Sequence, residues 1–309
     1  MDIGTLTTEA RNPASLELDA MSVPDLLSVM NAEDARVAPA VGAALPQIAA
    51  AVELITSSLR RGGRLVYLGA GTSGRIGLLD AVECPPTFDV DPDRVVALLA
   101  GGTGAFATAV EGAEDSASAA AADVDAARID ARDTVVGLAA SGRTPYVVAG
   151  LDRARARGAA TVSVACNAGA EVSAHADVAI EVETGPEVLT GSTRLKAGTA
   201  QKLVCNMLST AAMVRIGKVY GNLMIDMRPT NAKLVDRAER IVAAAAEVDR
   251  ATAAEALAAA GGRSKVATVM LLAGTDAAGA EALLDRAGGV VRAATAGQAA
   301  GVTAQTVQP

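Results

Sequence analysis

A short apolar stretch that ends in glycine, RLVYLGAG at 64–71, constrains the fold of this chain more than any other feature. Its Val, Tyr and Leu residues show no alternation of polar and apolar side chains, which indicates a strand buried on both faces. A segment with helical character, TSGRIGLLDAV at 72–82, follows at once. A buried strand that leads directly into a helix is the repeating element of parallel α/β folds.

The same pattern recurs four times after this first stretch. The further apolar stretches are RVVALLAGG at 94–102, DTVVGLAASG at 133–142, ATVSVAC at 160–166 and ADVAIEVET at 176–184. Helical segments separate the earlier ones, at 104–128 and 144–158. We therefore predict an α/β fold in three layers, a parallel sheet covered by helices on both faces.

Helical periodicity also flanks this alternating region. Residues 22–61 show helical periodicity and predict N-terminal helices, with a capping-box-like start at Ser22 and Asp25 and a stop at Gly62-Gly63. A mostly apolar run at 194–221 predicts one long helix closed by Gly221. Beyond Pro229, helical runs are expected at 233–248, 251–260, 264–273 and 278–285. We predict a main domain over 1–228, a small helical domain over 229–296 and a flexible tail over 297–309.

Composition and charge exclude several classes of partner. The chain has two Phe, three Tyr and no Trp, so the predicted core is aliphatic and stacking platforms for bases are scarce. The net charge of −8 comes with no basic stripe, which argues against nucleic acid. The longest clean apolar run, VATVMLLA at 266–273, is too short to span a bilayer, and the N-terminus lacks signal-peptide character. The expectation is a soluble, cytoplasmic protein without a membrane partner.

The cysteine and histidine residues are too few or too widely spaced for a disulfide framework or a zinc site. Cys84, Cys166 and Cys205 have unrelated spacings, which fit neither a disulfide framework nor a zinc knuckle. His175 is the one histidine of the chain, and we interpret it as a structural or surface residue. We predict no metal and no cofactor.

The first glycine loop permits two interpretations. Gly69, Gly71 and Gly74 fit the G-x-G-x-x-G pattern of dinucleotide-binding folds. Such folds place an acidic residue at the end of the next strand, but that strand ends in LLAGGTG, and Pro85-Pro86 is expected to cut the intervening helix short. These departures favour a smaller phosphorylated ligand.

A second loop repeats the chemistry of the first. AASGRTP at 139–145 also lies between a strand and a helix, and the carboxyl ends of parallel strands meet at one edge of the sheet. Helix N-termini and hydroxyl groups at that edge suit a phosphate group. The alternative is that both loops are merely capped turns, with the arginines tying loop to sheet or subunit to subunit. The predicted phosphate-binding residues are Gly71, Thr72, Ser73, Gly74, Arg75, Ser141, Gly142, Arg143 and Thr144.

Several blocks of the chain carry a family resemblance. LGAGTSGRIGLLDAVECPPTF at 68–88, AVEGAEDS at 109–116, GLAASGRTPYV at 137–147 and the segment at 184–227 resemble the sugar isomerase (SIS) domain of the N-acetylmuramic acid 6-phosphate etherases. LTTEARNPAS at 6–15 and the helical C-terminal part are also similar to that family. The resemblance implies a doubly wound, flavodoxin-like SIS domain and a C-terminal domain of ubiquitin-associated (UBA) type.

The resemblance also implies a reaction. An etherase of this family cleaves the bond between carbon 3 of an amino-sugar 6-phosphate and D-lactate by elimination and water addition, and needs no cofactor. Glu83 and Glu114 match the positions of the two proton-transfer groups, and the division of roles between them stays open. We expect Glu83 to be desolvated beside Cys84 and the two prolines, and so to act as the acid. Further candidates for sugar contacts, whose alternative role is helix capping, are Glu187, Thr190, Ser192 and Lys196.

Two other functions remain open for an SIS domain. A regulator would sense a phosphosugar without transforming it, as glucokinase regulatory protein does. An aldose–ketose isomerase would open the ring and abstract a proton but would not protonate an ether oxygen. The expected partners are a small phosphosugar and a second copy of the chain, with the helices at 22–61 and 194–221 as interface material.

Overall fold

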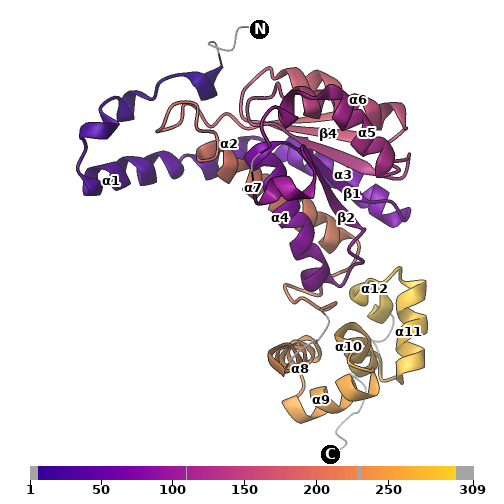
Figure 1. The fold of residues 1–309 in the computed structure, drawn as a ribbon. Coiled ribbons are helices and arrows are strands. Elements are labelled where there is room, and N and C mark those ends of the chain that lie inside the picture. The colour runs from indigo at the N-terminus through magenta and orange to yellow at the C-terminus, as the bar shows by residue number, and fades with distance from the viewer. Residues whose placement is uncertain (1–5, 109, 228–231, 297–309) are drawn as a thin grey trace, which may run out of the picture. The chain divides into compact units, whose positions relative to one another are not determined.

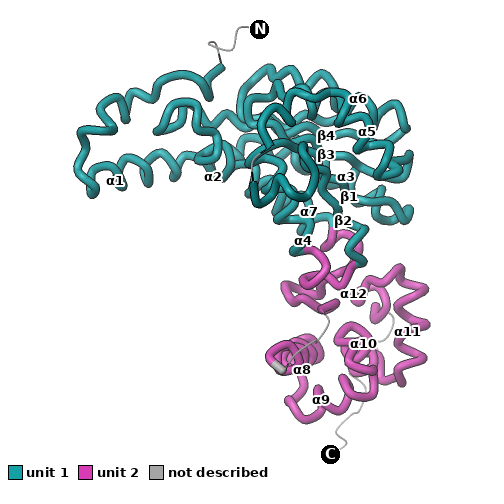
Figure 2. Tube along the Cα trace, viewed as in Figure 1, with its two compact units in different colours: residues 1–83, 91–212 teal, residues 84–90, 213–309 magenta. Residues whose placement is uncertain are grey.

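The computed structural model describes residues 6–108, 110–227 and 232–296. The chain forms two compact units, residues 1–83 with 91–212 and residues 84–90 with 213–309 (Figure 2). The tail predicted at 297–309 lies outside the described residues. The predicted boundary between 228 and 229 and the UBA type of the helical part stay predictions.

A parallel sheet forms the centre of the first unit (Figure 1). Its strands are β1 (Leu65–Gly69), β2 (Val95–Leu99), β3 (Thr134–Leu138), β4 (Ala160–Ala165) and β5 (Val178–Glu181). They lie in the order β2-β1-β3-β4-β5, and every pair is parallel. This is the flavodoxin-like doubly wound order, so the predicted fold class is confirmed.

Helices cover both faces of this sheet, because the central strands are apolar on both sides. The helices of the first unit, two of which begin in it and end beyond it, are α1 (Val23–Asp34), α2 (Val37–Ala43), α3 (Leu45–Arg60), α4 (Gly71–Phe88), α5 (Ala117–Ala126), α6 (Pro145–Ala156) and α7 (Lys196–Arg215). On one face, Val66, Leu68 and Val135 pack in a core with Tyr146 and Leu151 of α6. On the other face, α3 packs against β1, β3 and β5.

Close packing explains why two positions of the first loop, Gly69 and Gly74, carry no side chain. A Cβ atom on Gly74 would lie 2.3 Å from Leu99 Cδ1 and 2.6 Å from the Gly69 carbonyl oxygen. A Cβ atom on Gly69 would lie 2.8 Å from Gly74 Cα. The G-x-G-x-x-G pattern therefore serves close approach of α4 to β1 and β2 here, whichever ligand the loop binds.

Substituting the two glycines that bracket the first turn of α4 tests this account. We expect Gly74→Ala to lower the free energy of unfolding by about 1–3 kcal/mol, because the new methyl group overpacks against backbone. Gly71→Ala is the matched control, since Gly71 has open space around it and only its positive φ of 52° opposes a side chain. Its expected loss is about 1 kcal/mol, measured for both variants by urea unfolding. Equal losses would contradict the packing argument.

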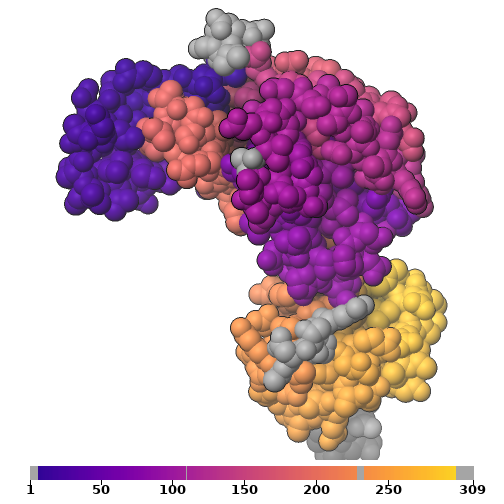
Figure 3. Space-filling model, in the orientation of Figure 1, coloured from indigo at the N-terminus to yellow at the C-terminus, as the bar shows by residue number. Residues whose placement is uncertain are grey.

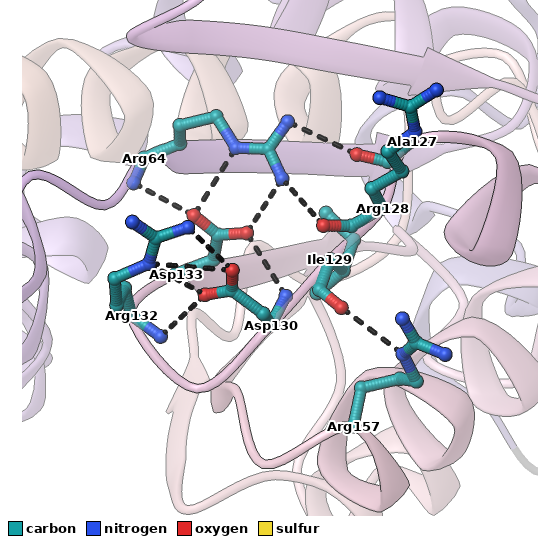
Figure 4. Close-up of polar contacts among 8 residues, drawn as sticks. All are labelled: Arg64, Ala127, Arg128, Ile129, Asp130, Arg132, Asp133 and Arg157. Carbon is teal, nitrogen blue, oxygen red and sulfur yellow. Dashed lines mark hydrogen bonds and ion pairs between the residues drawn. The ribbon is translucent and has the colours of Figure 1, made fainter.

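The opposite edge of the sheet is tied by an arginine network (Figure 4). The buried carboxylate of Asp133 accepts hydrogen bonds from the Arg64 backbone N–H at 2.9 Å and from its guanidinium at 2.7 and 3.1 Å. Hydrogen bonding to Asp133 raises the pKa of Arg64. Arg64 also donates to the carbonyl oxygens of Ala127 and Arg128. These bonds fix the starts of β1 and β3, and with them the register that aligns the two loops at the other ends of these strands.

The helical run predicted at 22–61 is divided in the structure into α1, α2 and α3. Ser22 caps α1 as expected, accepting a hydrogen bond from the Asp25 N–H. The breaks follow from Pro39 and Pro46, whose rings exclude helical bonding to the carbonyl groups of Ala35 and Gly42. The prediction of N-terminal helices over this range is confirmed, and the apolar spacing alone does not place the breaks between them.

Three other expected elements differ from the structure. The prediction that Pro85-Pro86 cuts the helix short was wrong, since α4 continues to Phe88 and the Asp89 N–H bonds the Pro85 carbonyl. The helix expected at 194–221 is shorter, because Gly217 adopts a φ of 84° after α7 ends at Arg215. Only the later part of 104–128 is α-helical, as α5, because Gly112 adopts a left-handed conformation ahead of it.

The second unit is a small helical bundle. Its helices are α8 (Ala232–Ala246), α9 (Arg250–Ala259), α10 (Ser264–Ala273), α11 (Ala277–Arg286) and α12 (Val291–Thr295). Val242, Leu257 and Val269 are among the residues of its apolar core. The first four helices match the expected runs, whereas α12, with 5 residues, is too short for sequence periodicity to indicate.

The length and apolar character of the helices bear on whether any of them could span a membrane. No single helix in the described part of the chain is both long and apolar enough to cross a bilayer. Two strongly bent pairs, Val23–Ala43 with Leu45–Arg60 and Arg250–Ala259 with Ser264–Ala273, meet these criteria only when taken together.

Candidate active site

The two predicted loops meet at the point where the strand order reverses. The last residue of β1, Gly69, pairs with Leu138, the last residue of β3. The first loop enters α4 at Gly71, and the second enters α6 at Pro145. The crevice beyond such a switch point is where open α/β sheets bind their ligands.

Two adjoining hollows occupy this edge, and Glu114 lines both. The larger, which we call the sugar pocket, has a volume of about 350 Å³ and is lined by Leu6, Glu9, Glu114, Asp115, Ser141, Arg143, Thr144 and Pro145. The smaller has a volume of about 200 Å³ and is lined by Ala70, Gly71, Arg75, Ala100, Ala105, Val110, Glu111, Gly112, Ala113 and Glu114. The structure thus brings predicted residues of both loops together with Glu114.

The second loop has groups free to bind an anion. Thr144 is the N-cap residue of α6, yet its side chain makes no capping hydrogen bond. Within the described residues, Nε and Nη1 of Arg143 are buried without a hydrogen-bond partner, although Nε forms a long ion pair of 3.9 Å with the exposed Glu171. Gly142 has a φ of 76°, and a Cβ there would lie 2.4 Å from Ala170 Cβ. A phosphate group would accept hydrogen bonds from both the arginine and the threonine.

The first loop uses two of its predicted side chains inside the protein instead. The Ser73 hydroxyl donates to Gln201 Oε1 at 2.9 Å, in a buried position between α4 and α7. Arg75 donates from Nε to the carbonyl oxygens of Ala105 and Phe106 at 3.1 and 3.0 Å. Arg75 therefore holds the segment after β2, which was the alternative considered for the arginines. Gln201 was missed by sequence reasoning, because a polar residue within an apolar helical run carries no signal of its partner.

Two candidates in the segment before α7 have structural contacts. Glu187 is fully buried and accepts hydrogen bonds from the N–H groups of Lys196 and Ala197, both at 3.0 Å. Burial raises the pKa of Glu187, although these backbone bonds oppose the change. Lys196 is 1% exposed and pairs with Glu33 of α1. Glu187 therefore caps the start of α7, which is the alternative role considered for this segment, and Lys196 ties the same start to α1. Neither side chain lines the sugar pocket.

The other two candidates of that segment, Thr190 and Ser192, lie in an accessible turn. Thr190 is exposed and Ser192 is half-buried, with its N–H bonded to the Leu189 carbonyl at 2.9 Å. Gly191 between them is close to Glu9, because a Cβ there would lie 3.3 Å from Glu9 Oε2. This turn therefore lies beside a residue of the sugar pocket.

Glu83 differs most from its expected setting. It lies in the exposed part of α4 beside Val82, which is 55% exposed, and it lines neither hollow. The expected desolvation is absent in the single chain, because α4 continues regularly through the prolines and presents this turn to solvent. The catalytic role of Glu83 stays a prediction. The expectation that its side chain is desolvated is corrected, because the residue is exposed.

Three further ionisable groups of the first unit, outside the two hollows, lie in structural settings. Burial raises the pKa of Asp80, which accepts hydrogen bonds from the Tyr67 hydroxyl at 2.8 Å and the Ser209 hydroxyl at 3.0 Å. Burial also raises the pKa of Cys166 to about 12. His175 lies 2.7 Å from the exposed Asp152. Among the described residues, no group of three or more His, Cys, Asp and Glu side chains is arranged to hold a metal ion.

Comparisons with known proteins extend over nearly the whole chain. An N-acetylmuramic acid 6-phosphate etherase from Mycolicibacterium smegmatis is 68% identical over 294 residues, which are 95% of this chain and 99% of the relative. The chain belongs to the N-acetylmuramic acid 6-phosphate etherase family. An etherase from Exiguobacterium is 56% identical over 94% of this chain and 98% of its own, and one from Edwardsiella ictaluri is 52% identical over 95% and 98%.

The family models and solved structures concern the SIS domain and its fold. Residues 47–155 match the N-terminal SIS domain of glucokinase regulatory protein, and residues 109–211 match the SIS domain. A phosphoheptose isomerase from Francisella tularensis, 18% identical, aligns with a TM-score of 0.50 over 63% of this chain and 100% of its own. That likeness concerns the fold alone. The etherase relatives described above, which match over nearly the full chain, confirm the resemblance inferred from the motifs.

Proposed function

We propose that this protein is a carbon–oxygen lyase that cleaves the lactyl ether of N-acetylmuramic acid 6-phosphate, giving N-acetylglucosamine 6-phosphate and D-lactate in the breakdown of cell-wall amino sugars. The observation that carries the proposal is the meeting of Glu114 with the second loop in one pocket, in a chain whose etherase relatives match along almost its full length. The sensing and isomerase alternatives have no comparable support.

The chemistry follows from the substrate's own carbonyl group. Ring opening exposes an aldehyde at carbon 1, which acidifies the proton on carbon 2. A base takes that proton, a double bond forms between carbons 2 and 3, and the carbon 3–oxygen bond breaks as an acid protonates the departing lactate oxygen. Water then adds at carbon 3 and a proton returns to carbon 2, so that the sum is ether hydrolysis. The aldehyde acts as the electron sink.

We assign Glu114 as the base at carbon 2 and Glu83 as the acid. Glu114 fits the first role because it lines both hollows at the switch point. Glu83 fits the second by its position in the family motif and requires burial that the single chain lacks. A homodimer that covers the outer face of α4, where Leu79 and Val82 are exposed, would supply that burial.

The phosphate group is assigned to the second loop and to the start of α4. Ser141, Arg143 and Thr144 line the sugar pocket, and Thr72 belongs to the same edge of the sheet. The backbone N–H groups predicted to join them, those of Gly74 and Gly142, instead donate to the carbonyl oxygens of Ala70 and Ala139 at 3.1 and 2.9 Å. Three buried free cysteines support a reducing, cytoplasmic location. Such a location suits a phosphorylated substrate, whose charge prevents passage through a bilayer.

Product analysis separates the three readings of the site. The purified protein is incubated with N-acetylmuramic acid 6-phosphate, and lactate and sugar phosphates are quantified by mass spectrometry. The etherase produces lactate and N-acetylglucosamine 6-phosphate in equal amounts. A ketose phosphate with the lactyl group intact would indicate an isomerase, and binding without any product would indicate a sensor.

A further inference from the structure

Buried polar contacts fasten the N-terminal arm, residues 6–22, to the second loop. Asn167, 2% exposed, accepts hydrogen bonds at Oδ1 from the Thr8 N–H at 3.2 Å and the Thr7 hydroxyl at 2.8 Å. Its Nδ2 donates to Thr8 Oγ1 at 3.0 Å and to the carbonyl oxygens of Ala140 and Ser141, both at 3.3 Å. One side chain after β4 thus binds the arm and the predicted phosphate loop together.

A second set of contacts fastens the arm a few residues later. Asn12, 4% exposed, donates to Glu33 Oε2 at 2.9 Å and to the Pro186 carbonyl at 3.0 Å. Glu33 is also the partner of Lys196 at the start of α7. Ser15 adds a hydrogen bond of 2.8 Å to the Val188 carbonyl. Figure 3 shows the salmon surface of the segment around 186–195 lying against the indigo arm.

Glu9 lies between these two anchors and faces the sugar pocket. It lines that pocket with Glu114, Ser141 and Thr144, and its carboxylate lies close to Gly191 on the neighbouring turn. Within the described residues, the Glu9 carboxylate takes part in no hydrogen bond or ion pair. The hydrogen bonds of the two anchors are buried or partly buried, so they hold the arm on either side of Glu9 in a fixed place. Glu9 is therefore a carboxylate held in position and free to accept hydrogen bonds.

We propose that Glu9 is a substrate-binding residue that recognises the sugar rather than the phosphate. A carboxylate accepts hydrogen bonds from hydroxyl and amide N–H groups and repels phosphate oxygens. Arg143, Ser141 and Thr144, which line the same pocket, supply the cation and the hydroxyl donors that suit the phosphate. The N-terminal arm is thus part of the binding site and contributes its specificity for a phosphosugar over free phosphate. This inference rests on the proposed function for the identity of the sugar.

Binding measurements on isosteric variants test the proposal. Glu9→Gln keeps the shape of the side chain but removes its charge, and Glu17→Gln makes the same change at an exposed position of the same arm. Isothermal titration with N-acetylglucosamine 6-phosphate is expected to show about tenfold to hundredfold weaker binding for Glu9→Gln and no change for Glu17→Gln. Titration with inorganic phosphate is expected to show unchanged or tighter binding for Glu9→Gln, because a repulsive charge is gone.

The decisive result is weaker binding of the phosphosugar by Glu9→Gln without weaker binding of inorganic phosphate. Equal weakening towards phosphosugar and phosphate would overturn the proposal, because it would show that Glu9 only supports the loop. Unchanged phosphosugar binding in Glu9→Gln would overturn it as well. Because both titrations report binding, they remain interpretable if the wild-type protein releases no lactate, in which case the proposed function fails independently.

Discussion

Replacement of Glu114 by glutamine is expected to slow lactate release by about 10²- to 10⁴-fold, the usual contribution of a general base. The carboxamide has nearly the same shape but cannot take the proton from carbon 2. Since Glu114 lines both hollows, its loss should affect kcat more than KM. The rate of lactate release from N-acetylmuramic acid 6-phosphate is the measurement.

Asp115→Asn is the matched control for this substitution. Asp115 is the next residue of the same short helix (Ala113–Asp115) and also lines the sugar pocket. If local negative charge were the cause of activity, both variants would lose it alike, which would contradict the assignment of Glu114 as base. A loss in Glu114→Gln alone, with phosphosugar binding retained, is the expected pattern.

Lys196→Met is expected to lower the free energy of unfolding by about 3–5 kcal/mol, because it leaves the carboxylate of Glu33 buried without its main cation. Lys196 is 1% exposed, and Glu33 also accepts a hydrogen bond from Asn12. Lys202→Met, at an exposed position of the same helix, is the control and should change stability little. Urea unfolding of both variants measures the difference, and similar losses would contradict a specific role for the Lys196–Glu33 pair.

The loss in the free energy of unfolding caused by Lys196→Met is expected to depend on pH in a defined direction. Burial raises the pKa of Glu33, but the hydrogen bonds from Lys196 and Asn12 outweigh it, so the pKa lies below its ordinary value of 4.5. The contribution of ionised Glu33 to stability is therefore complete above about pH 4.5 and is lost as the pH falls through the lower folded pKa. Lys196→Met removes the largest of the contributions that lower this pKa and leaves those of Asn12 and Arg36. The stability gap between wild type and variant should narrow in acid, and a gap that widens would contradict this account.

The sheet and the two loops could be predicted from sequence because their signals are local. Strands such as Val95–Leu99 and Thr134–Leu138 are apolar without alternation, and each predicted loop directly follows a strand. In a parallel sheet this is enough to put Gly71 and Ser141 at one edge. Glu114 could be selected only through the family motif, because an acidic residue in a polar turn otherwise resembles a solvated surface.

The anchoring contacts could not be predicted, because they join residues far apart in the chain. Asn167 and Thr8 are separated by 159 positions, and Lys196 and Glu33 by 163. Neither pair has a spacing that periodicity detects, so Lys196 could be named as a candidate for sugar contacts without any sign of its pairing with Glu33. Glu9 was overlooked for the same reason. The exposure of Glu83 depends on how the helix passes Pro85-Pro86, which local propensity misjudged.

The central claim, cleavage of the carbon 3–oxygen bond, is tested most directly by locating oxygen from water in the products. The reaction is run with N-acetylmuramic acid 6-phosphate in oxygen-18 water, for a single turnover, and lactate and sugar phosphate are analysed by mass spectrometry. Elimination followed by water addition predicts one label at carbon 3 of N-acetylglucosamine 6-phosphate and unlabelled lactate, once exchange at the aldehyde oxygen is subtracted with an unreacted control. Label in the hydroxyl group of lactate, or no lactate at all, would contradict the account.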